Sequence, residues 1–99
     1  MDEKNITLNG QYLEYKGRPL VLEANTICHG FMEDPYVLMM TIMTTKKQKE
    51  TEVPDKILIQ IVKTDKNLSA QERIVKQDMK SGLHDAFDIG LIWLERYLA

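Results

Sequence analysis

The segment Tyr36–Thr45 constrains the fold most, because it has the pattern of a β-strand that is apolar on both faces. β-Branched and aromatic residues are frequent in it, and a proline precedes it. Both sets of alternate positions are largely apolar, with Tyr36, Leu38, Met40, Ile42 and Thr44 on one face and Val37, Met39, Thr41, Met43 and Thr45 on the other. A strand with one wet face alternates polar and apolar residues. We therefore expect this strand at the centre of a sheet, with both faces covered.

Shorter runs on the N-terminal side predict further strands. Gln11–Tyr15 and Leu20–Leu22 form a hairpin across a short link that contains glycine. The second of these strands is expected to continue through Asn25–Cys28. Ile6–Leu8 comes before an Asn-Gly pair, which is a further turn candidate.

On the C-terminal side, Ile57–Val62 predicts a strand with Ile57, Ile59 and Ile61 on one face and Leu58, Gln60 and Val62 on the other. A polar link over Lys46–Val53 separates it from Tyr36–Thr45. Because this link is short for a parallel crossover, we expect the two strands to pair antiparallel.

Residues 69–79 allow two interpretations. Ser69–Glu72 matches a capping box, which favours the start of a helix. Ile74 and Val75 instead fit a short fifth strand bounded by charged residues. A helix here has only Ile74, Val75 and Met79 for an apolar stripe, so the strand is the preferred interpretation.

Ser81–Leu98 has the periodicity of an amphipathic helix. Its apolar residues fall close to one stripe, formed by Leu83, Phe87, Leu91, Leu94 and Leu98 and broadened by Ala86, Ile89 and Trp93. Ser81 is the expected N-cap, and Arg96 near the end suits the helix dipole. Gly90 costs about 1 kcal/mol relative to alanine inside a helix. A close contact between helix and sheet would explain that glycine.

The 99 residues are expected to form one α+β domain over 1–99, an antiparallel meander sheet of four or five strands with the C-terminal helix packed on one face. Such a helix is roughly 27 Å long and about 10 Å wide. A five-stranded sheet is about 20–24 Å across, so the helix covers one face at most. The sequence leaves open which face that is. Curling of the sheet, a second chain in a twofold dimer, or an apolar ligand or partner would cover the other face.

Composition argues against several classes of function. The 13 basic and 15 acidic residues give a net charge of −2, which favours neither nucleic acid nor a membrane surface as partner. One cysteine excludes an intrachain disulfide framework, and Cys28, His29 and His84 are too few for a metal site. We therefore expect no metal and no cofactor. The charged first residues lack an apolar signal segment, and the longest apolar run is far below the ~20 residues of a membrane span. The expected location is the cytoplasm.

Two residue pairs have types found in catalytic sites, and both have a simpler interpretation. Cys28 and His29 are neighbours, but adjacent side chains on a strand point to opposite faces. His84 and Asp88 share one face of the predicted helix, where an acidic residue near the N-terminus already suits the dipole. The sequence contains no phosphate-binding glycine loop and no GxSxG motif. We therefore predict no catalytic residue, and an enzyme is the least favoured hypothesis.

The favoured hypothesis is a protein that acts through the uncovered sheet face, either by self-association as a homodimer or other homo-oligomer or by binding a protein partner. The predicted binding residues are Val37, Met39, Met43 and Trp93. Methionine side chains are flexible and suit an adaptable surface. The alternative is a small-molecule site between sheet and helix, lined by Met39 or Met40 together with Phe87 and Trp93.

Overall fold

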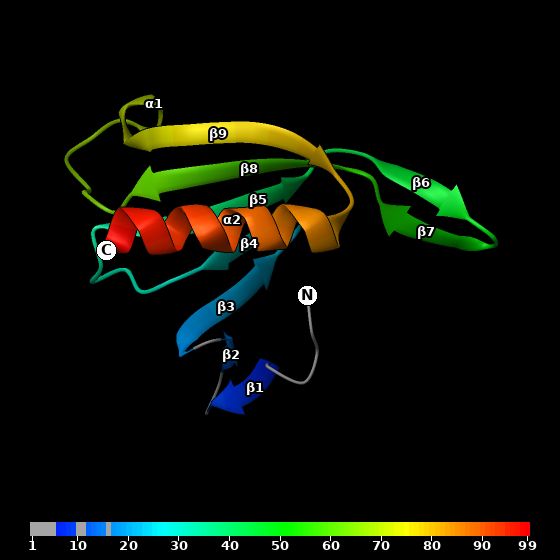
Figure 1. Ribbon diagram of the computed structural model, residues 1–99, viewed down its shortest axis with the longest axis horizontal. Coiled ribbons are helices and arrows are strands. Elements are labelled where there is room, and N and C mark those ends of the chain that lie inside the picture. Colours follow the sequence, from blue (N-terminus) through cyan, green and yellow to red (C-terminus); the bar gives the residue numbers. More distant parts are fainter. Residues whose placement is uncertain (1–5, 10–11, 16) are drawn as a thin grey trace.

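The main sheet of the protein is antiparallel, and its strands follow the order β1-β2-β3-β4-β5-β8-β9 (Figure 1). The computed structural model describes residues 6–9, 12–15 and 17–99. The strands of this sheet are β1 Ile6–Asn9, β2 Tyr12–Tyr15, β3 Arg18–Glu23, β4 Thr26–His29, β5 Tyr36–Ile42, β8 Lys56–Lys63 and β9 Ile74–Ser81. Each strand pairs with its neighbours in chain order apart from an inserted hairpin. The predicted α+β class and antiparallel meander are confirmed.

The N-terminal strands differ from expectation in one respect. The strand predicted to run on through Asn25–Cys28 is instead two strands, β3 and β4, joined by a tight turn. Ala24 in this turn has φ 53°, which reverses the chain direction. Asn25 Nδ2 donates a hydrogen bond to the carbonyl oxygen of Ile42 at 3.1 Å and so anchors the turn to the end of β5.

The predicted polar link over Lys46–Val53 is wrong, because this segment forms most of a second hairpin. Its strands are β6 Thr45–Gln48 and β7 Thr51–Pro54, so β5 ends at Ile42 and not at Thr45. The hairpin projects beyond the end of the main sheet (Figure 1). Backbone hydrogen bonds between Met43 and Lys56 and between Asp55 and Thr44 continue the pairing into it. With β6 fully exposed, the hairpin has no core side that an alternating pattern would reveal.

Both interpretations of residues 69–79 are present in succession. α1 Ala70–Arg73 is one turn of helix with a complete capping box, in which the Glu72 backbone N–H donates to Ser69 Oγ at 3.2 Å. The Ser69 backbone N–H donates to Glu72 Oε1, also at 3.2 Å. Ile74 then turns to extended backbone and begins β9. β9 is therefore longer than the short strand that the sequence predicts.

The C-terminal helix is α2 Leu83–Leu98, and it packs against β5, β8 and β9. The expected N-cap at Ser81 is wrong, because Ser81 still pairs with Lys56 in the sheet and Gly82 is the N-cap. Gly82 has φ 88°, a conformation that glycine adopts without strain. The close contact expected at Gly90 is confirmed. A Cβ atom there would lie 2.7 Å from Leu38 Cδ1.

The core lies between α2 and one face of the sheet. Its fully buried side chains include Leu38, Met40, Ile57, Ile59, Ile61, Phe87 and Leu94. The even-numbered residues of β5 and the odd-numbered residues of β8 therefore face the helix. His29 is also buried on this side, with Nδ1 at 3.1 Å from the carbonyl oxygen of Pro19 and its ring 5.8 Å from that of Phe87. The helix thus covers the even-numbered face of Tyr36–Ile42. The sequence alone did not decide between the two faces.

Candidate docking surface

The opposite face of strands β3, β4, β5, β8 and β9 is called here the open face, because within the described residues no helix packs across it. Antiparallel register places its residues in three rows that run across the strands. The first row is Pro19, Gly30, Val37, Val62 and Ile74. The second row is Val21, Cys28, Met39, Gln60 and Gln77. The third row is Glu23, Thr26, Thr41, Leu58 and Met79.

These three rows contain one charged residue, Glu23. The difference in charge between the two faces of the sheet is clearest in the edge strand β9. Its charged residues Lys76, Asp78 and Lys80 pair with the core isoleucines of β8 and so lie on the helix side of the sheet. Its uncharged residues Gln77 and Met79 lie on the open face. A sheet face adapted to bulk water usually shows the reverse distribution.

Charged residues occur instead around the margin of the open face. Glu33 follows β4, and Arg73 comes just before β9. Lys56 begins β8, where its ammonium group donates a hydrogen bond to Ser81 Oγ at 2.8 Å. An uncharged centre with a charged margin is the arrangement typical of protein–protein interfaces.

The open face is partly apolar and shallowly hollowed. Val21 is 47% exposed and Met79 is 44% exposed, which is high for apolar side chains on a sheet. One hollow of about 440 Å³ lies by Val21, Cys28 and Phe31. A second, of about 330 Å³, lies by Met39 and Ile74 and is bordered by α1. Because Cys28 and Met39 are register partners, the two hollows are neighbours on one surface.

The structure places the four predicted binding residues in different surroundings. Met39 is half-buried on the open face, where it lines the second hollow. Val37 lies on the same face but is buried against Gly30. Met43 is exposed just beyond the end of β5. Trp93 lies on the helix side, with the Lys76 ammonium group 4.8 Å from its ring centroid.

Sequence reasoning did not select Val21, Cys28, Leu58 and Met79 as binding residues, although they lie on the open face. A signal for Met79 was present in β9, where uncharged residues alternate with Lys76, Asp78 and Lys80. That alternation becomes informative once the charged side is known to lie beside the helix. Val21 and Cys28 join the same surface through long-range pairing, which a local pattern does not contain.

The possible catalytic pairs are arranged as their simpler interpretation requires. Cys28 lies on the open face and His29 is buried on the other side of the sheet. Burial raises the pKa of the Cys28 thiol, which lowers the fraction of reactive thiolate at neutral pH. His84 Nε2 is 3.4 Å from Asp88 Oδ2, and both side chains are exposed. The described residues contain no group of three His, Cys, Asp or Glu side chains that could hold a metal ion.

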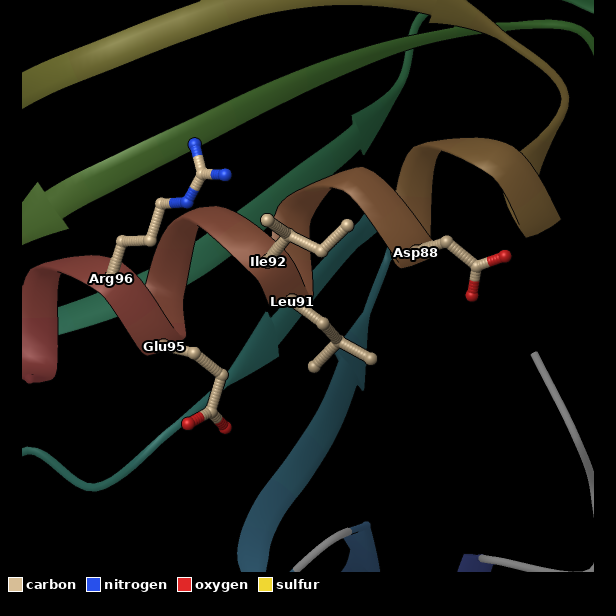
Figure 2. Close-up of a pocket in the computed structure, with 5 residues that line it drawn as sticks. All are labelled: Asp88, Leu91, Ile92, Glu95 and Arg96. Atoms are coloured by element: carbon tan, nitrogen blue, oxygen red, sulfur yellow. The ribbon is translucent and has the colours of Figure 1, made fainter.

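A further hollow, of about 450 Å³, lies on the outer surface of α2 (Figure 2). Its side chains diverge, since Leu91 and Glu95 point to one side of the helix and Arg96 points to the other. Glu95 is already engaged by Arg18 of β3, at 2.8 Å between Nη1 and Oε1. Polar groups that fix a small ligand need to converge on it, which these do not.

Comparisons of the chain with protein-family models, with curated proteins and with solved structures find no match. In the part of the chain that the structure describes, the helices are too short or too polar to cross a membrane. The protein is a small α+β domain with exposed apolar side chains, and its function has to be inferred from its own residues.

Proposed function

We propose that this domain works by binding a protein surface through its open face. The observation that carries the proposal is the near absence of charge from the three rows, although 28% of the chain is charged. Selection for solubility alone would place charged residues on a water-facing sheet. Keeping them off this face is advantageous when another surface covers it, because burying an unpaired charge is costly.

The shape of the open face favours a protein over a small molecule. Its hollows are shallow and lie side by side over several strands, whereas small ligands are usually enclosed in a cleft. The alternative site between sheet and helix has less support. Met40 and Phe87 are fully buried, and α2 approaches the sheet closely at Gly90. A space for a ligand there would require the helix to move.

Three companion proposals rest on composition. The domain acts in the cytoplasm, and its partners include neither nucleic acid nor a membrane. The lysine-rich hairpin β6–β7 supports this, because Lys46, Lys47 and Lys49 are offset by Glu50 and Glu52. Nucleic-acid-binding arms usually carry a stronger positive charge.

Site-specific photocrosslinking tests the docking function. A benzophenone side chain is introduced in place of Met79 on the open face, and in a matched control in place of Ile92 on α2, which is 51% exposed. On irradiation in cells that express the chain, we expect protein adducts from position 79 and far fewer from position 92. Adducts of equal yield from both positions, or none from position 79, would overturn the proposal.

A further inference from the structure

We infer that the surface bound by the open face is a second copy of this chain, related by a twofold axis parallel to the strands and passing over β5. This inference rests on the proposed docking function and names its partner. Three properties of the face support it: the opposite charges at its two sides, its uncharged centre and its area.

The margin of the open face is acidic on one side and basic on the other. Glu23 at the end of β3 and Glu33 beside Val21 and Cys28 mark the β3 side. Lys56 of β8 and Arg73, the last residue of α1, mark the β9 side. Among the described residues, the salt bridges involve neither Glu23 nor Glu33. Arg73 uses Nε to donate to the Leu68 carbonyl oxygen. The face therefore carries a charge gradient across the strands.

A twofold axis parallel to the strands places the β3 side of one copy over the β9 side of the other. It brings Glu33 of one copy towards Arg73 of the second, and Glu23 towards Lys56. Each contact occurs twice, as in every isologous interface. An axis across the strands would instead place β3 over β3 and bring Glu23 towards Glu33. Charge complementarity thus selects the first axis.

The centre of the face suits this arrangement, because the first two rows carry no charged residue and the third carries only Glu23, at its β3 end. Met39 lies on β5 and would face Met39 of the other copy, while Cys28 would face Gln60. A methionine side chain is flexible, so it can pack against the same methionine of the second copy without a preformed complementary surface. Two sheets packed face to face in this way lie about 10 Å apart.

The available area matches a reversible dimer. Five strands at about 4.8 Å spacing and three rows at about 6.8 Å spacing cover roughly 24 by 20 Å, including side chains. Each copy then buries on the order of 500 Å² at most, and the pair about 1,000 Å² at most, because Val37 and Val62 of the first row are already buried in the single chain. This is the lower limit for a specific interface, so we expect dissociation in the micromolar range or weaker.

Sedimentation equilibrium of the purified chain is the primary test, run from about 1 µM to about 1 mM. We expect the mass to rise from the 11.5 kDa monomer towards twice that value. Val21→Lys and Leu22→Lys form a matched pair, since the residues are neighbours on β3 and point to opposite faces. Both are exposed, at 47% and 65%. Val21→Lys should weaken dimerisation by at least ~tenfold, and Leu22→Lys by less than ~twofold.

A charge swap tests the axis itself. Glu23→Lys and Lys56→Glu each create like charges between copies and should weaken the dimer by roughly threefold to tenfold. The double variant restores opposite charges and should recover most of the affinity. Both side chains are exposed, so the fold should tolerate the changes. The proposed axis would be overturned if the double variant lost as much free energy of dimerisation as the two single variants lose when their effects are added.

The failure of this inference is distinct from failure of the docking function. A chain that stays monomeric to 1 mM, roughly the highest practical concentration, while position 79 crosslinks to a different protein, refutes the second copy and keeps the docking face. A monomeric chain without adducts from position 79 refutes both. A dimer that Val21→Lys and Leu22→Lys disrupt equally refutes the open face as the surface between copies.

Discussion

The two faces of one sheet in this protein are built from the same strands and differ in almost every other respect. The helix side is filled by branched aliphatic residues, with Ile57, Ile59 and Ile61 fully buried beneath α2. The open face carries methionine, cysteine, threonine and glutamine among its apolar residues. Branched side chains have few rotamers and fix one packing arrangement. The side chains of the open face tolerate both water and contact, which suits a surface that is covered only part of the time.

Charge separates the two faces further, in the direction opposite to that of an ordinary two-layer domain. The charged residues of β9 flank the helix, where Lys76 also lies over Trp93 at 4.8 Å. The open face has its charges at the margin alone. A sheet face that is exposed in the single chain is therefore not always a face adapted to contact water. The distribution of charged residues is a better indicator of a water-adapted face than solvent exposure.

Truncation of two neighbouring methionines provides the largest test of this comparison. Met40 is fully buried on the helix side, and Met39 is half-buried on the open face of the same strand. Met40→Ala should lower the free energy of unfolding by about 2–5 kcal/mol. Met39→Ala should lower it by about 1 kcal/mol or less, because it leaves no closed cavity. Urea denaturation of dilute samples measures both. Equal losses would show that the two faces are packed alike.

Gly90→Val tests how tightly the helix lies on its face of the sheet. The first added carbon would lie 2.7 Å from Leu38 Cδ1 and 3.4 Å from Ile59 Cγ2, so side chains must shift. Overpacking of this kind costs about 1–3 kcal/mol, which thermal or urea unfolding would show. Ile92→Val, on the exposed surface of the same helix, is the control and should change stability little. Retention of full stability by Gly90→Val would mean that helix and sheet separate easily.

Local pattern was enough to predict the elements that contribute to the core. The two apolar faces of Tyr36–Thr45 predict a central strand, which the structure forms over Tyr36–Ile42. The cost of Gly90 in a helix predicts a close contact, which is present. These predictions depend on a buried face, and the hairpin β6–β7 was not predicted because it has none. Its residues are mostly exposed, so no buried face imposes alternation on them. Ser81 was misassigned because a good capping residue can also end a strand.

The candidate surface was predictable only in part, since it depends on register. The sequence placed Val37 and Met39 on one face of one strand, and both lie on the open face. That Val21 and Cys28 continue the second row follows from pairing across β3, β4 and β5, which local alternation does not specify. Trp93 was selected as an aromatic residue on the helix stripe, and it lies on the other side of the sheet.

Reactivity of Cys28 measures whether the open face is covered. Burial raises the pKa of this thiol in the single chain, so alkylation at neutral pH should be slower than in the unfolded chain. The rate should increase as the pH rises towards the raised pKa. At a fixed pH, the alkylation rate should fall as the protein concentration rises, if a second copy covers the second row. Mass spectrometry after timed iodoacetamide exposure gives the rates. A rate independent of concentration in a sample that dimerises would place the interface elsewhere.

The smallest expected effect comes from the capping box of α1, which borders the open face. Hydrogen bonds from the Ser69 hydroxyl and backbone N–H hold the pKa of Glu72 below its ordinary value. A lowered folded-state pKa stabilises the protein above the unfolded-state pKa, and this contribution is lost as the pH falls through the folded value. Ser69→Ala should raise the Glu72 pKa towards its ordinary value, as an NMR titration of the carboxyl carbon would show. The same variant should lower stability by about 1 kcal/mol at neutral pH, with little change in dimerisation, because neither Ser69 nor Glu72 belongs to the three rows. A marked loss of dimer would show that the contact of Arg73, the last residue of α1, with the second copy depends on the capping box.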